Sequence, residues 1–99
     1  MVPLPVEFHP EADAELGEAV DRYEAERRGV GVRFAAAVAA ALHRLASAPE
    51  EGPPLAPGVR RLLVPGFPYQ VVYRADAAPL RVLAVAHLRR RAGYWRGRR

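Results

Sequence analysis

The feature of the sequence that most constrains its fold is a series of three apolar runs in the C-terminal half, separated by short turns. The runs are Val59–Val64, Tyr69–Arg74 and Leu80–His87, each of strand length and rich in valine, leucine or tyrosine. Pro65-Gly66 separates the first two runs, and residues 76–79 separate the last two. Connections this short join antiparallel strands, whereas parallel neighbours need a longer crossover. The sequence therefore predicts a three-stranded antiparallel meander.

The third run predicts a sheet with two partly apolar faces. One face must pack on the rest of the protein, and the other is either covered by the chain's own C-terminus or left open for a partner. Side chains alternate between the two faces along a regular strand. This alternation places Arg81, Leu83, Val85 and His87 on one face and Val82, Ala84 and Ala86 on the other.

The N-terminal half predicts a short strand followed by two helices. Val6–Phe8 is the strand, and His9-Pro10 begins the first helix, which ends close to Gly29. A second helix starts near Gly31 and carries one apolar stripe, with many alanines between the stripe positions. Four prolines between residues 49 and 57 interrupt regular structure, so this segment is predicted to be a loop.

These elements predict an α+β fold. An N-terminal strand and an antiparallel two-helix hairpin are expected to pack on an antiparallel β-meander, with a short C-terminal tail. The chain has 99 residues, which is enough for a single modest core. We therefore expect one domain over residues 1–99.

The composition excludes several kinds of chemistry. The chain has no cysteine, which excludes disulfides and thiolate metal sites, and no spacing of histidines or carboxylates resembles a metal motif, so neither metal nor cofactor is expected. It also lacks lysine and threonine, and Ser47 is its only serine, so the usual covalent nucleophiles are missing. No apolar run approaches the roughly 20 residues of a membrane span, and the N-terminus does not resemble a signal peptide. We therefore expect a cytoplasmic protein with no membrane partner.

Charge is divided unequally between the two halves of the chain. Residues 1–51 hold five arginines and ten acidic residues, whereas residues 52–99 hold ten arginines and only Asp76, so the halves carry −5 and +9. A domain with this distribution offers a positive face to an anionic partner, either a nucleic acid or an acidic protein segment. The alternative is that the arginines are simply solvated.

His87 is the candidate for proton transfer. It ends the third strand and precedes a run of arginines, and histidine is the side chain whose pKa lies near neutrality. The alternative is a structural histidine that hydrogen-bonds its own backbone at the strand end. His9 and His43 are expected to be structural.

The arginines of the meander and tail, with two aromatic residues, form the candidate binding surface. Arginine binds phosphate in bidentate fashion and stacks on bases, and it pairs equally with acidic protein side chains. Trp95 has a second possible role as an apolar latch that holds the tail on the sheet. The predicted binding residues are Arg60, Arg61, Arg74, Arg81, Arg89, Arg90, Arg91, Tyr94 and Trp95.

A series of local strings extends over nearly the whole chain: VEFHPEA (6–12), RYE (22–24), VRRLL (59–63), FPYQVVY (67–73), VLAVAH (82–87) and YW (94–95). In this order they resemble the RelE/ParE superfamily of type II toxin-antitoxin toxins. The resemblance implies a small bacterial toxin that is silenced by a cognate antitoxin from the same operon, in a toxin-antitoxin hetero-oligomer. RelE-like members are ribosome-dependent mRNA endoribonucleases, and ParE-like members act on DNA gyrase.

The resemblance also implies roles for individual residues. Arg61 stands where RelE-like toxins have a basic residue, Arg89 or Arg90 stands for their late arginine, Tyr94 stands for their tail tyrosine, and His87 has counterparts in related nucleases. Leu63 and Gln70, however, stand where two further basic residues are expected. Part of the phosphate-neutralising set is therefore missing, which points to the ParE-like branch.

Three functions remain open from the sequence. The first is a toxin that binds a cellular target, DNA gyrase, and is neutralised by its antitoxin, both through the binding residues above. The second is an mRNA endoribonuclease with His87, Tyr94 and Arg61 as catalytic residues. The third is a non-toxic basic module that binds nucleic acid.

Overall fold

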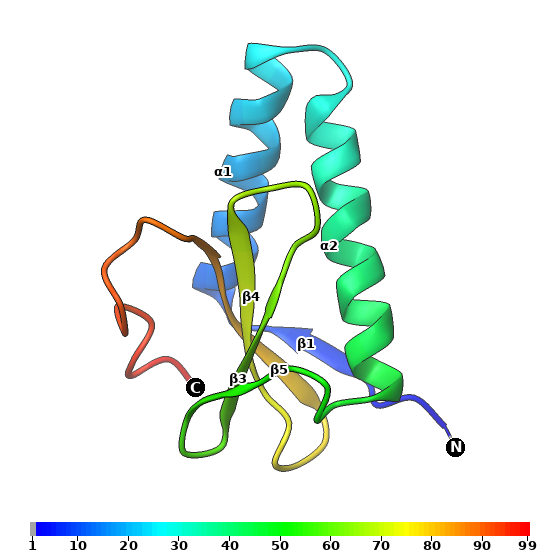
Figure 1. Ribbon diagram of the computed structural model, residues 1–99, viewed down its shortest axis with the longest axis vertical. Coiled ribbons are helices and arrows are strands. Elements are labelled where there is room, and N and C mark those ends of the chain that lie inside the picture. The colour runs from blue at the N-terminus through cyan, green and yellow to red at the C-terminus, as the bar shows by residue number, and fades with distance from the viewer. Residues whose placement is uncertain (1) are drawn as a thin grey trace.

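Two helices cover one face of a five-stranded sheet in the computed structural model, which describes residues 2–99 (Figure 1). This is the α+β architecture that the sequence predicts. After the last strand the chain curls back as a tail, residues 88–99, drawn orange to red in Figure 1. In chain order the elements are β1 (Val6–Phe8), α1 (Pro10–Glu26), α2 (Val30–Ser47), β2 (Pro54–Ala56), β3 (Val59–Leu63), β4 (Tyr69–Arg74) and β5 (Leu80–His87).

The sheet has the strand order β1-β5-β4-β3-β2. Strands β3, β4 and β5 form the predicted antiparallel meander, with β3 ending at Leu63, one residue earlier than expected. β1 pairs with β5 in parallel, from Val6 opposite Leu80 to Phe8 opposite Val82. The second half of β5 therefore has no strand neighbour on this side.

The prediction of a loop for residues 49–57 is wrong at Pro54–Ala56, which forms β2 at the other edge of the sheet. Pro54 lies opposite Arg60 in β3, and Ala56 lies opposite Val59. A proline has no N–H to donate, and it is tolerated on an edge strand because one side of such a strand has no partner.

The alternation predicted for β5 is wrong beyond Leu83, because the strand contains a β-bulge. Tyr73 pairs with Val82, but its neighbour Val72 pairs with Ala84, so Leu83 is the extra residue. An extra residue shifts all the side chains that follow it to the other face. The helix face of β5 therefore carries Val82, Val85 and His87, and the opposite face carries Arg81, Leu83, Ala84 and Ala86.

Side-chain hydrogen bonds cap the start of α1 and fix the connection between α1 and α2. His9 Nδ1 accepts a hydrogen bond of 3.1 Å from the Glu11 N–H and caps the start of α1, which confirms the structural role expected for His9. At the far end the Glu24 carboxylate accepts hydrogen bonds from the N–H groups of Gly29 and Gly31, at 2.8 and 3.0 Å. The short connection between the helices is therefore fixed.

The main core lies between the helices and the sheet. Phe34 of α2 is fully buried among Tyr23, Phe67 and Tyr69, and the ring centroids of this cluster lie 4.8 to 6.1 Å apart. The hydroxyl of the buried Tyr73 donates to a carbonyl of the loop after α2 at 2.8 Å and accepts from an N–H of the same loop at 3.1 Å. Aromatic side chains thus fill the core around Phe34, and the Tyr73 hydroxyl holds the loop between α2 and β2 in place through two hydrogen bonds.

Among the helices of residues 2–99, α2 alone is long and apolar enough, by length and composition, to cross a membrane; its 18 residues have a mean hydropathy of 1.2. The sequence did not predict a helix this long and this apolar. Its stripe of Phe34, Val38 and Leu45 fills the core described above, so the fold accounts for the apolar character of the helix.

The face of the sheet away from the helices, which we call the tail face, is partly covered by the tail. Trp95 has only 5% of its surface exposed and packs in a cluster with Val59, Val72 and Leu83. Of the two possibilities that the sequence left open, the structure shows the first for this part of the face, with Trp95 as the latch, while Leu63 on the same face stays 52% exposed.

Candidate functional site

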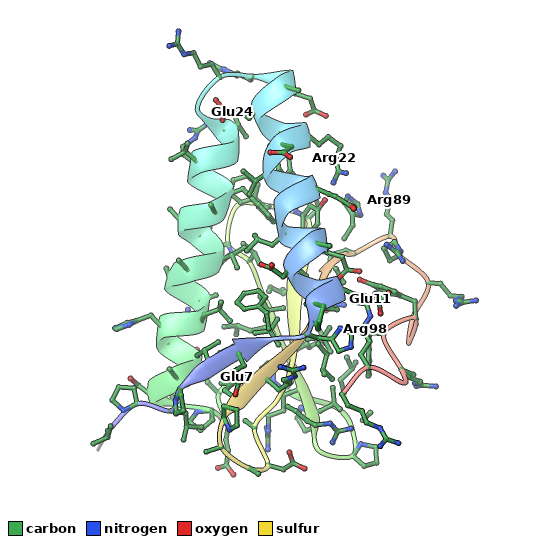
Figure 2. The ribbon with its side chains drawn as sticks, turned by 180° about the vertical axis from the view of Figure 1, so that it is seen from behind. Glu7, Glu11, Arg22, Glu24, Arg89 and Arg98 are labelled. Carbon is green, nitrogen blue, oxygen red and sulfur yellow. The ribbon has the colours of Figure 1, made fainter. Side chains whose placement is uncertain are left out.

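An ion pair between α1 and the tail closes the open edge of β5. Arg98 Nη1 and Nη2 lie 3.0 and 3.1 Å from the two carboxylate oxygens of Glu15. Glu15 also accepts a hydrogen bond from the Val85 N–H at 3.1 Å, and Arg98 donates to the Leu83 carbonyl at 3.0 Å. Figure 2 shows Arg98 reaching toward the start of α1, where Glu11 Oε2 lies 3.4 Å from Arg98 Nε. The side chains of Glu15 and Arg98 thus bond to backbone groups of β5 that a neighbouring strand would otherwise pair with.

Two guanidinium groups contact the ring of Tyr94. The Cζ atoms of Arg90 and Arg98 are 3.8 and 5.1 Å from the centroid of its ring, which is cation–π geometry. Its hydroxyl is enclosed and has no hydrogen-bond partner among residues 2–99. Burial, reinforced by the nearby Glu15 carboxylate, raises the pKa of Tyr94 well above its ordinary value. The side chain is therefore a neutral phenol at physiological pH.

Several predicted binding residues make contacts within the fold. Arg60 donates to two carbonyls of the loop after α2 at 3.2 and 2.8 Å. Arg81 donates to the carbonyl of the last residue at 3.0 Å and lies 3.8 Å from Glu7, and Arg74 lies 3.7 Å from Asp76. Within residues 2–99, no ion pair with a carboxylate is formed by Arg61, Arg89, Arg90 or Arg91.

His87 lies in a cleft of about 310 Å³ between α1 and the end of β5, which we call the α1–β5 cleft. Its Nδ1 accepts a hydrogen bond of 3.0 Å from the Arg89 N–H, which is the backbone contact that the sequence analysis offered as the alternative. Because Nδ1 is an acceptor, the neutral ring carries its proton on Nε2. The ring packs edge-on against Tyr69, with centroids 5.1 Å apart. The cleft is lined by Glu15, Glu18, Arg22, Tyr69, Val85, His87 and Arg90.

The three residues that α1 contributes to the cleft, Glu15, Glu18 and Arg22, were not among the predicted site residues. Spacings of three and four residues place Glu15, Glu18 and Arg22 on one face of a helix, which the sequence does show. It does not show that this face is turned toward the end of β5. There Arg22 donates a hydrogen bond to the hydroxyl of Tyr69, so the two walls of the cleft are joined.

The three residues predicted to be catalytic occupy different places. The ring of His87 is on the helix side of the sheet, whereas Arg61 lies opposite Val72 on the tail face. Tyr94 lies in the tail with its hydroxyl enclosed. The structure therefore brings His87 together with Arg90 and with residues of α1, and not with Arg61.

Comparison with known proteins places this fold in a family. The sequence profile described as "ParE toxin of type II toxin-antitoxin system, parDE" matches residues 6–92. The structure is similar to a solved chain of the chromosomal ParDE toxin-antitoxin system from P. aeruginosa, with a TM-score of 0.74 and 18% sequence identity over 85% of this chain and 95% of that chain. No curated protein matches the sequence. The superfamily indicated by the local strings is thus confirmed, and the chain belongs to the ParE toxin family of type II toxin-antitoxin systems.

Proposed function

We propose that this toxin arrests growth in the cytoplasm by binding DNA gyrase, and that its antitoxin neutralises it by covering the same surface. The observation that carries the proposal is the position of His87 and Arg61 on opposite faces of the sheet. Cleavage of RNA by acid–base chemistry needs the proton-transfer group and the charge-stabilising group at one phosphodiester. His87 and Arg61 do not meet this requirement together, whereas binding a protein does not impose it. The arginines that do lie near His87, Arg22 and Arg90, line the α1–β5 cleft, defined above, on the helix side of the sheet.

The part of the tail face that the tail leaves open has the composition of a binding surface. Leu63 is 52% exposed and lies opposite Gln70, two residues from Arg61 on the same strand. The exposed Leu88 and the arginines that follow it begin the tail. Apolar side chains next to arginines are the combination that dominates the binding energy of protein interfaces.

The antitoxin is a partner that a toxin of this family implies. We propose that its toxin-binding segment is acidic, because the C-terminal half of the chain carries +9 and, within residues 2–99, several of its arginines form no ion pair with a carboxylate. Arg61→Glu and Leu63→Glu should each weaken binding of the antitoxin at least tenfold, about the effect of losing one desolvated contact. Arg27→Glu, at the far end of the helix hairpin, is the matched charge reversal and should have little effect. Equal loss in all three variants would rule out the tail face as the antitoxin site.

Induction in bacteria with labelled precursors tests the target. We expect DNA synthesis to stop first, with DNA-damage signalling, and His87→Ala to remain as toxic as the unchanged protein. An early stop in protein synthesis that His87→Ala abolishes would contradict the proposal and favour the endoribonuclease. Growth unaffected by the unchanged protein would favour the non-toxic nucleic-acid-binding module.

A further inference from the structure

The α1–β5 cleft contains two guanidinium groups that are held in place but not neutralised. Arg22 is held by its hydrogen bond to the Tyr69 hydroxyl, and the guanidinium of Arg90 lies over the Tyr94 ring, with Cζ 3.8 Å from the ring centroid. Within residues 2–99 neither forms an ion pair with a carboxylate. Arg98, a few residues along the tail, is by contrast fully paired with Glu15.

Guanidinium groups fixed by neutral aromatic partners keep their charge available for a ligand. Arginine binds phosphate through two parallel N–H donors, and less conformational entropy is lost when the donors are already positioned. His87 adds a third donor, because its Nδ1 is occupied by the Arg89 N–H and its ring proton is on Nε2. Its ring is also fixed, by the edge-on contact with Tyr69.

The two carboxylates of the cleft, Glu15 and Glu18, differ in whether their charge is compensated within the protein. Glu15 is shared among Arg98 and the Val85 N–H, so its charge is compensated within the protein. Glu18 is exposed and has no ion-pair partner among residues 2–99. A ligand with only negative charge would be repelled by Glu18, but one that also carries a hydroxyl or amino donor could bind to it.

We propose that the α1–β5 cleft binds a nucleoside monophosphate. The phosphate lies between Arg22 and Arg90 with His87 as an additional donor, and Glu18 accepts a hydrogen bond from a sugar hydroxyl. The volume of about 310 Å³ is at the lower end of the range for small-molecule sites, which is room for one nucleotide. The site shares Arg90 with the proposed binding surface, but its other residues lie on the helix side of the sheet, so it does not depend on gyrase being the target.

Titration of the full-length isotope-labelled protein with adenosine 5′-monophosphate, followed by NMR, tests the proposal. We expect saturable shifts of the His87 ring resonances, and an affinity that falls about tenfold or more in Arg22→Gln and in Arg90→Gln, as for loss of a charge-assisted hydrogen bond. Arg28→Gln is the matched control, since Arg28 is an exposed arginine just beyond the end of α1 that does not line the cleft. The absence of saturable shifts, or an equal loss of affinity in the Arg28→Gln control, would overturn the proposal.

Two further titrations define the ligand. Inorganic phosphate should bind more weakly than the nucleotide, and Glu18→Gln should reduce this preference; an unchanged preference would remove Glu18 from the site. A single-stranded ten-nucleotide DNA that binds more tightly than the mononucleotide, at the same resonances, would overturn the choice of a free nucleotide.

The variants also need a stability control, because Arg22→Gln removes the hydrogen bond to Tyr69. Thermal unfolding of each variant is therefore compared. If Arg22→Gln is unstable, Arg90→Gln, which lies outside the core, decides the outcome.

Discussion

The carboxylate of Glu15 and the guanidinium of Arg98 form a two-pronged ion pair, with N–O distances of 3.0 and 3.1 Å, that joins α1 to the end of the tail. Only 14% and 11% of the two side chains are exposed. The pair also satisfies the Val85 N–H and the Leu83 carbonyl, which have no strand neighbour. The end of the tail is therefore anchored by this pair and by Trp95.

Glu15→Gln should lower the free energy of unfolding by about 2–4 kcal/mol, because it leaves the largely buried charge of Arg98 without its main counter-ion. The exposed Glu11 compensates only weakly at 3.4 Å. Urea denaturation measures the change. The control is Glu51→Gln, which breaks the exposed pair with Arg44 and should cost less than about 1 kcal/mol. If the two substitutions have the same small effect, the pair does not anchor the tail.

Trp95→Ala should destabilise the protein by about 3 kcal/mol and release the tail, since Trp95 is the largest side chain of the cluster on the tail face. Trp95→Phe should cost less, because a smaller aromatic ring still covers part of Leu83 and Val59. Urea denaturation and the rate of proteolysis after the tail arginines measure the two effects. Stable variants that are cleaved no faster than the unchanged protein would show that the tail is held without its tryptophan.

Stability should fall as the pH rises above about 10. Burial is the first cause that raises the pKa values of Tyr23, Tyr73 and Tyr94 in the folded protein. An unfolded tyrosine loses its proton near pH 10 while the folded one keeps it, so the stabilisation is complete below this pH and is lost above it. Urea denaturation between pH 7 and pH 11 measures the slope.

Tyr94→Phe isolates the contribution of one tyrosine. At pH 7 it should change the free energy of unfolding by less than about 1 kcal/mol, because the enclosed hydroxyl makes no hydrogen bond of normal geometry among residues 2–99 and only the nearby Glu15 carboxylate offsets its desolvation. Above pH 10 the variant should lose less stability than the unchanged protein. An identical pH profile would mean that the Tyr94 hydroxyl is accessible to water.

The strands of the meander are predictable from the sequence because turn residues separate the apolar runs. Which side chains of β5 lie on which face of the sheet is not predictable. The extra residue of the bulge, Leu83, is apolar and fits either face, so the sequence pattern continues unbroken through it. β2 escapes prediction for a related reason, since Pro54 excludes a central strand but not an edge strand.

The candidate site is predictable only in part, because charge segregation along the chain is not segregation in space. The excess of arginine in the C-terminal half predicts a cationic surface, but Arg98 is neutralised by an acid that lies 83 residues earlier. The role of Arg22 depends in the same way on a contact with Tyr69, 47 residues away. Such pairings arise from tertiary structure, and local spacing does not reveal them.

Two glycines of the helix hairpin should respond to alanine with opposite signs. A Cβ at Gly31 would lie 2.4 Å from the Val20 carbonyl oxygen and 2.9 Å from the Glu24 Cβ, so Gly31→Ala must push the helices apart. It should cost about 1–3 kcal/mol, as overpacking does. At Gly17, on the exposed side of α1, a Cβ would meet nothing within 4 Å, and Gly17→Ala should stabilise by about 0.5–1 kcal/mol through the lower conformational entropy of the unfolded chain.

The comparison of these two variants tests whether close helix packing, and not helix propensity, selects glycine at position 31. Thermal unfolding should show a lower midpoint for Gly31→Ala and a higher one for Gly17→Ala. The Gly31 substitution also strains the connection that Glu24 holds through its two hydrogen bonds, so Glu24→Gln combined with Gly31→Ala should cost less than the sum of the single changes. A stabilising Gly31→Ala would show that α2 can move away from α1 without loss, and the tight hairpin would then have no role in the stability of the fold.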